Sequence, residues 1–547
     1  SCSGDEPGAP AGAADLVLRN AVVYTVDSVR SWARSVAVRD GRIVHVGGDS
    51  LPAGLIGPAT EVVDLRGGMV LPGFQDGHVH LLLGGVELGE CTLFTLPTAA
   101  AVLDSIGTCA AARPEGWLRG VGWELTAFPE ANPTKAMLDR IAPNRPALLE
   151  AADGHSAWAN SRALELAGIT RETPDPPEGR IERDAKGEPS GTLRESAIEL
   201  VSRMLPERTD EELARGLERA LRLAAERGIT AVTEASASER DLRTYAAADR
   251  ARRLSVRVIA AVDAALDSSG VAGVIRRLDS WRKRYATPRV RPSAAKLYQD
   301  GVIESGTAAL LAPYLDRQGD AGAPIYPQPV LDSLVAALDR AEWQVHVHAI
   351  GDRAIRMTLD AFEQARSVNG RRDARHTITH LQLIDPADQP RFKALGVVAN
   401  FEPFWANGDE YLTRLAEPAL GPARSRWLYP IGSLVRQGAV VSGGSDWSVS
   451  SLAPLDGIQV AVTRRPPRSG EPPWRPEETV ELSRAIAMYT IDAAYQHHLE
   501  KETGSIEVGK LADLVVLERN LFEVPAGDVH AVRVLRTLVE GETTFRR

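Results

Sequence analysis

The sequence has few cysteines, no long apolar run and no excess of positive charge, and each of these features excludes a class of protein. Three cysteines occur in 547 residues and none forms a Cys-x-x-Cys pair, so a cysteine-based zinc site is not expected. No apolar stretch reaches the roughly 20 residues that span a bilayer. The formal net charge of −10 argues against nucleic acid as the main partner.

The start of the chain and the cysteines give the only indications of location. Residues 1–13 are rich in Gly, Ala and Pro, which predicts a disordered tether. Cys2 precedes small polar and acidic residues, as at the mature start of a bacterial lipoprotein. We therefore expect a lipid anchor at Cys2 and a place in the bacterial cell envelope; the alternative is an incidental Cys2 in a cytoplasmic protein. In an oxidising envelope Cys91 and Cys109 can form a disulfide, and otherwise they are two buried thiols.

Short β-type runs at both ends of the chain predict one composite β domain. The N-terminal runs are separated by turn residues such as Asn20 and Asp40-Gly41. Residues 504–517 form a turn followed by a strand pattern, and residues 532–544 form two more strand patterns around a Glu-Gly turn. We predict a β-sandwich built from residues 14–70 and 501–547.

Between these ends, apolar strand-type runs alternate with helix-type stretches at 211–227, 331–342 and 354–366, which indicates a parallel α/β arrangement. Eight such runs predict a (β/α)₈ TIM-like barrel over residues 71–500. The gap after the first run is too long for one crossover, so about residues 85–210 are expected to form an insertion over the mouth of the barrel. The runs are Val70–His80, Thr230–Glu234, Val256–Val262, Ala295–Asp300, Trp343–His348, Thr377–His380, Val397–Phe401 and Ala439–Asp446.

The first of these runs ends in two histidines, His78 and His80, one residue apart. On a strand, residues i and i+2 point to the same face, so both imidazoles project together, as two ligands of one metal ion require. A His-x-His pair alone is often incidental. The hypothesis of a metal site therefore depends on ligands from the rest of the chain.

Further metal-competent side chains end or line later runs, at the mouth where barrel enzymes keep their sites. They are Lys296, His348, His380 and Asp446. Each has an ordinary alternative explanation: a snorkelling surface lysine, a hydrogen-bonded strand-end histidine, or an aspartate that caps a helix or turn. Together with the histidine pair, they favour one shared site over six separate coincidences.

Several longer motifs resemble the amidohydrolase superfamily, and within it the YtcJ-like branch of amidohydrolase family 3 that includes N-substituted formamide deformylase. The resemblance covers nearly the whole chain after residue 14. The motifs that carry it are Gly73–His80, Asp153–Leu164, Gly191–Glu195, Lys296–Gly301, His348–Ala354, Gly444–Trp447 and Gly504–Leu517.

The resemblance implies a site with two divalent metal ions. Its ligands would be His78, His80, Lys296, His348, His380 and Asp446. Lys296 would carry a carbamate from CO2, because a free ammonium would repel two cations. Imidazole, carboxylate and carbamate ligands together suit zinc best. His346 shares a face with His348, but His348 lies in the family's motif, and we expect His346 one layer deeper.

The expected reaction is cleavage of a C–N bond in an amide-type small molecule by a metal-activated hydroxide. Asp446 would serve as general base and then as general acid. His155, within a family motif in the insertion, is assigned a role in binding substrate or stabilising the oxyanion; the alternative is a structural histidine beside Ser156.

Other residues complete the expected pocket. Tyr298, Asp300 and Trp447 are expected to line or support it. Trp123 is a candidate for an apolar substrate site, although large aromatics belong to the core by default. A homodimer would be in keeping with relatives.

Other functions remain open from the sequence. The same ligand set would serve a lactonase, a carboxylesterase or a phosphotriester hydrolase. A deaminase is less expected, because the additional His/Glu pairing near strand five is missing after His348. A non-catalytic barrel scaffold would have lost ligands, whereas this chain has a candidate at every ligand position.

Overall fold

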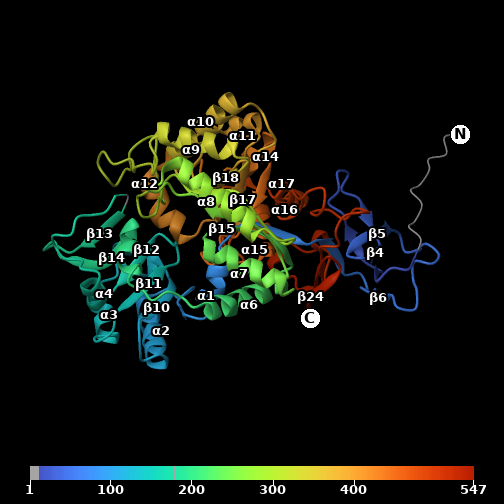
Figure 1. Cartoon of the computed structure of the whole chain (residues 1–547), viewed down its shortest axis with the longest axis horizontal. Coiled ribbons are helices and arrows are strands. Elements are labelled where there is room, and N and C mark those ends of the chain that lie inside the picture. Colours follow the sequence, from blue (N-terminus) through green and yellow to red (C-terminus); the bar gives the residue numbers. More distant parts are fainter. Residues whose placement is uncertain (1–11, 178) are drawn as a thin grey trace.

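The computed structural model describes residues 12–177 and 179–547, and its centre is an eight-stranded parallel sheet that curls into a barrel (Figure 1). Each predicted run overlaps one strand of this barrel, so the predicted TIM-like barrel is confirmed, although the run Val70–His80 also includes the end of a strand in another sheet, β7 (Met69–Pro72). The strands are β8 (Phe74–Val79), β15 (Ile229–Ala237), β16 (Arg257–Asp263), β17 (Val290–Tyr298), β18 (Gln344–Ala349), β19 (Thr377–His380), β20 (Val398–Phe401) and β21 (Val441–Gly443), paired in this order.

Amphipathic helices cover the outside of the barrel. In α6 (Asp210–Glu226), Thr209 and Glu212 form a capping box that satisfies free N–H groups of the first turn. Its residues at helical spacing, such as Leu213, Leu217 and Ala220, are buried, which fixes the face that packs inward. The other large helices are α7 (Glu239–Arg250), α8 (Gly270–Tyr285), α9 (Gln328–Arg340), α10 (Asp352–Asn369) and α15 (Pro454–Thr463).

The first strand, β8, and the last, β21, are not paired as neighbouring strands, and the barrel is closed between them by individual hydrogen bonds. The backbone N–H groups of Ser445 and Asp446, which follow β21, donate to the carbonyl of His78 in β8 at 3.2 and 2.8 Å. The end of the first strand and the segment after the last strand are therefore joined at the mouth, where the N–H of His80 also donates to the carbonyl of Trp447 at 2.9 Å.

Two further sheets pack together at one end of the molecule (Figure 1). Leu18, Val36, Val70 and Leu514 contribute to the core that these sheets share. One sheet has the order β24-β23-β22-β7-β2-β3 and so contains strands from both chain ends, and the other has the order β5-β4-β1-β6. Their strands are β1 (Leu16–Arg19), β2 (Val22–Tyr24), β3 (Trp32–Ala33), β4 (Ser35–Arg39), β5 (Arg42–Gly47), β6 (Glu61–Asp64), β7 (Met69–Pro72), β22 (Leu514–Leu517), β23 (Val534–Val539) and β24 (Glu542–Arg546).

The long segment between β8 and β15 forms a separate six-stranded sheet at the opposite end of the molecule (Figure 1). It has its own core, with Trp123, Phe128 and Trp158 in edge-to-face contact. Its elements are β9 (Cys91–Thr92), α2 (Ala99–Ala112), β10 (Leu118–Trp123), α3 (Lys135–Ile141), β11 (Ala147–Ala151), β12 (Ser156–Ala159), α4 (Ser161–Leu166), β13 (Gly179–Arg183) and β14 (Pro189–Glu195).

Cys91 and Cys109 are joined by a disulfide that connects β9 to α2. Cys2 lies outside the described residues. Among the described residues, no helix is both long enough and apolar enough to cross a bilayer.

We predict that protein folded under oxidising conditions contains the Cys91–Cys109 bond, and that the double variant Cys91→Ser/Cys109→Ser loses about 3 kcal/mol of unfolding free energy. This is the magnitude expected from closing a short loop in the unfolded chain. Mass spectrometry of unreduced proteolytic peptides tests the bond, and urea unfolding tests the energy. The control Cys2→Ser should keep the linked peptide. Two free thiols at positions 91 and 109 would refute the pairing.

Candidate metal centre

All six residues expected as ligands line one cavity of about 1160 Å³ at the mouth of the barrel. The barrel forms its floor, and insertion residues such as Asp153, His155 and Glu195 form part of its wall. The six ligand candidates are His78, His80, Lys296, His348, His380 and Asp446. Residues from β8 to β21, far apart in sequence, therefore converge on one space.

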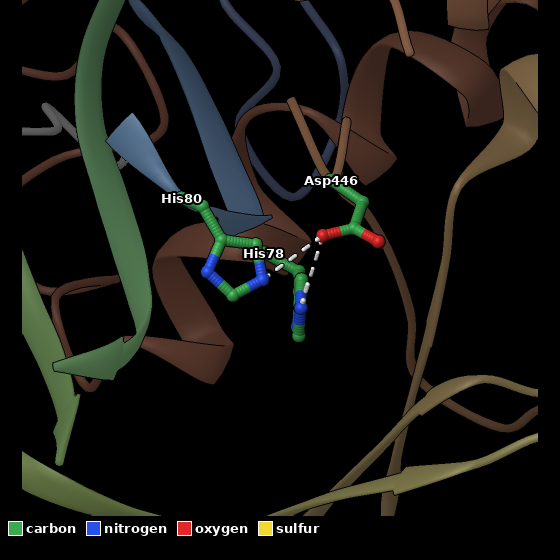
Figure 2. A group of neighbouring side chains, drawn as sticks. All are labelled: His78, His80 and Asp446. Atoms are coloured by element: carbon green, nitrogen blue, oxygen red, sulfur yellow. Dashed lines mark ion pairs between the residues drawn. The ribbon is translucent and has the colours of Figure 1, made fainter. Parts of the chain in front are cut away.

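His78, His80 and Asp446 form the tightest group of ligand-type side chains (Figure 2). Asp446 Oδ1 lies 3.3 Å from His80 Nε2 and 3.5 Å from His78 Nε2. One donor atom from each residue lies within 4.8 Å of the other two. Asp446 Oδ1 is buried and makes no hydrogen bond among the described residues. A buried acceptor of this kind, facing two imidazoles, fits a cation.

The charge states of this group also suit a cation. Burial alone would raise the pKa of Asp446, but His80, His380 and Lys296 outweigh it and hold that pKa below its ordinary value. Burial lowers the pKa of His78 and of His348 well below the usual value. The neutral imidazole that results is the form that binds metals.

Lys296 is almost completely buried beside these residues. Its side chain is 1% exposed, and Nζ lies 3.5 Å from His78 Nε2. Burial lowers the pKa of Lys296 to about 7. A large share of this lysine is therefore an uncharged amine at neutral pH, the form that acts as a nucleophile.

His348 and His380 form the other side of the ligand group, with ring centres 4.5 Å apart. His380 Nδ1 lies 3.0 Å from the carboxylate of Glu402, a residue that is completely buried just after β20. Because Nδ1 donates to Glu402, the opposite nitrogen, Nε2, is free for the cavity. His346 is absent from the cavity wall, and its Nε2 contacts His78 Nδ1 at 2.7 Å from behind.

Two buried aspartates fix the backbone that carries the ligands. Asp76 Oδ1 accepts hydrogen bonds from the N–H groups of His78 at 3.1 Å and Ser445 at 3.0 Å, and so connects the first and last strands. Asp300 accepts from the N–H groups of Ile350 and Gly351, directly after β18, at 3.0 and 2.8 Å. Burial raises the pKa of both carboxyls to about 7 despite these hydrogen bonds.

Of the residues expected to form the pocket, Tyr298 and Asp300 line the cavity, whereas the two tryptophans do not. The expectation for Trp123 is wrong, because its ring is completely buried in the core of the insertion and its Nε1 donates to the Leu149 carbonyl. Trp447, which is expected to line or support the pocket, does not line it, but its carbonyl accepts the His80 N–H at 2.9 Å. Its ring lies against Gly84 of α1 (Leu81–Glu87), where an added Cβ would be 2.6 Å from the ring.

His155 enters the cavity from the turn between β11 and β12 of the insertion. Its ring centre is 5.3 Å from that of His348, and its Nδ1 lies 2.8 Å from Glu195 Oε2. Burial disfavours the cation, but the Glu195 carboxylate outweighs burial and raises the pKa of His155 to about 9. Glu195 and Glu402 were missed as site residues, although Glu195 ends the motif Gly191–Glu195, because only the fold brings each of them to its histidine.

Comparisons with known proteins give the family and the fold that this chain resembles. The model of the amidohydrolase family matches residues 61–545. The chain is 34% identical to the protein LONG AFTER FAR-RED 3 of Arabidopsis thaliana, over 98% of this chain and 92% of the relative. It is 30% identical to N-substituted formamide deformylase of Arthrobacter pascens, over 97% and 98%.

Among solved structures, an uncharacterised metal-dependent hydrolase of Pyrococcus horikoshii OT3 has the same fold, with a TM-score of 0.74 and 23% identity. The match covers 94% of this chain and 99% of that one. The motifs, the barrel and the match over most of the chain lead to one conclusion: this protein belongs to the amidohydrolase family.

Proposed function

We propose that the protein is a metal-dependent hydrolase that cleaves a C–N bond in an amide-type small molecule. The observation that carries this proposal is the convergence of six ligand-type side chains on one buried cavity. His78, His80 and Asp446 would hold one divalent ion. Lys296, as a carbamate, would hold a second ion together with His348 and His380. Zinc suits these nitrogen and oxygen donors best.

The properties of Lys296 support the carbamate. Addition of CO2 requires an uncharged amine, and burial brings the pKa of Lys296 to about 7. The product is an anion, and the neutral imidazoles around it would leave that charge unbalanced without cations. Ions bound there would supply a Lewis acid for the substrate carbonyl and lower the pKa of water.

Residues of the chain account for the proton transfers. Asp446 is held as a carboxylate at the mouth, so it can take the proton of the attacking water and return it to the leaving nitrogen. His155 faces the same space from the insertion, where its N–H can bind the substrate oxygen. Cavity residues from the insertion would select the substrate, since loops and insertions carry specificity in barrels.

The disulfide supports our proposal for location. Disulfides persist in oxidising compartments and are rare in the cytosol of most organisms. The Cys91–Cys109 bond therefore supports the proposal that the protein acts in the bacterial cell envelope.

We predict two metal ions per chain in protein purified with bicarbonate. Lys296→Ala should lose at least one ion and lower kcat/KM at least about 100-fold, because it removes the anionic ligand that Lys296 would supply as a carbamate. Plasma mass spectrometry measures the metal content, and a carbamate signal in ¹³C NMR after ¹³C-bicarbonate treatment tests the modification. The exposed Lys283→Ala is the control and should change neither quantity. One ion per chain in both the wild type and Lys296→Ala would show that Lys296 is not a ligand.

We predict that Asp446→Asn lowers kcat on amides by about 10²–10⁴, the range for loss of a general base. A panel of N-acyl and N-formyl amines, esters and lactones measures this, with metal content determined for each sample. Asp528→Asn, at an exposed site, is the control. Wild-type hydrolysis of esters or lactones but of no amide would favour the lactonase or carboxylesterase alternative. Full activity of metal-loaded Asp446→Asn would exclude Asp446 as the base.

A further inference from the structure

His155 and Glu195 form a histidine–carboxylate pair at the junction of insertion and barrel. The two side chains come from different strands of the insertion sheet, because His155 directly precedes β12 and Glu195 ends β14. The side chains are 18% and 16% exposed, and Nδ1 lies 2.8 Å from Oε2. An ionised carboxylate only accepts hydrogen bonds, so the proton of this bond lies on Nδ1. The other ring nitrogen, Nε2, is left for the cavity.

The second oxygen of Glu195 is held by the barrel. Thr307, in the loop between β17 and α9, donates its hydroxyl to Glu195 Oε1 at 2.6 Å. Gly301 lies in the same loop, and an added Cβ there would collide with Glu195 Oε1 and with the Thr307 hydroxyl. The carbonyl of Gly301 is 3.2 Å from Nε2 of His348. One small network thus connects the insertion, a barrel loop and a proposed metal ligand.

The backbone conformation of Glu195 is unusual, which indicates that its carboxylate is held in one specific place. Its φ is +49° and its ψ is −129°, a conformation that non-glycine residues rarely adopt. Residues held in such conformations cost free energy and cluster at functional sites. The strand thus ends in a costly turn that directs Glu195 toward His155 and Thr307.

We infer that Glu195 is the positioning residue of His155: it fixes the protonated Nδ1 and presents Nε2 to the substrate in the cavity. Thr307 and Gly301 set the place of the carboxylate relative to the barrel. The inference rests on the proposed function, because it requires that a substrate bind beside His155. It assigns a role in the reaction to a contact that otherwise only joins the insertion to the barrel.

A double-mutant cycle tests this inference with the metal-loaded full chain. Glu195→Gln keeps the shape of the side chain and removes its charge. We expect it to lower kcat about 10–100-fold with little change in KM, the range for a group that acts through another side chain. In a His155→Asn background, the same change should lower kcat less than about twofold, because its target is gone. An equal loss in both backgrounds would overturn the inference.

A second readout does not depend on activity. In ¹⁵N NMR of histidine-labelled protein, the His155 signals, assigned by their loss in His155→Asn, should show a protonated Nδ1, and Glu195→Gln should shift them. Unchanged signals would overturn the inference. If Glu195→Gln does not fold, Thr307→Val replaces it, because this variant removes only the hydroxyl that holds Oε1, and it should shift the same signals less.

A matched control comes from another buried histidine–carboxylate pair. Asp339 Oδ1 lies 3.1 Å from His376 Nε2, and neither residue lines the cavity. Asp339→Asn should leave the NMR signals of His155 unshifted. Its effect on kcat should be the same factor in the wild type and in the His155→Asn variant. If wild-type protein cleaves no amide or ester, the proposed function fails, and the NMR measurement alone decides the role of Glu195.

Discussion

The mouth of this barrel depends on polar side chains that are buried beside one another. Asp446 Oδ1 is buried and faces the Nε2 atoms of His80 and His78 at 3.3 and 3.5 Å. Burying such a carboxylate costs free energy unless opposite charge is nearby. The same burial lowers the pKa of His78, His348 and Lys296, so their nitrogen lone pairs are free. The burial that is costly for these residues is therefore also what prepares them for a cation.

The arrangement of the ligands depends on carboxylates that are not ligands themselves. His78 lies in the first strand, β8, and Asp446 follows the last strand, β21. These two strands are not paired in the sheet. Asp76 holds them together through two backbone N–H groups. Gly444 allows the close approach, since a Cβ there would lie 2.9 Å from the His78 nitrogen. Backbone hydrogen bonds are stiff, so the spacing of the ligands is set by the closure of the barrel.

The strands and the ligand-type residues were predictable, because their signals are local. A strand in a parallel barrel is a short apolar run, and a side chain that lines the mouth lies at the end of the run or just after it, as His380 and Asp446 do. What the sequence could not supply is contact between distant segments. Glu402 resembles any other glutamate until the fold brings it to His380, and the motif Gly191–Glu195 does not show that Glu195 meets His155.

The expectation for Trp123 failed for a related physical reason. Large aromatic rings gain most from complete burial, and burial can be reached in any of several cores. Trp123 lies in the core of the insertion, beside Phe128 and Trp158, although Val121, two residues earlier, lines the cavity. The sequence shows that such a residue will be buried, but it does not show against which neighbours.

The insertion and the barrel have separate cores, which bears on how the proposed ligand set and the choice of substrate could be divided between them. The insertion has its own core and disulfide, so its shape does not depend on the metal ligands. Hydroxyl–carboxylate contacts join it to the barrel, Thr307 with Glu195 at 2.6 Å and Tyr411 with Glu124 at 2.8 Å, and Tyr411 and Leu415 also pack against its core. A substitution in the insertion can therefore alter the wall of the cavity while the carboxylates of the barrel keep the ligand candidates in place. In the proposed function, chemistry belongs to the barrel and selection to the insertion, so one can change while the core of the other is kept.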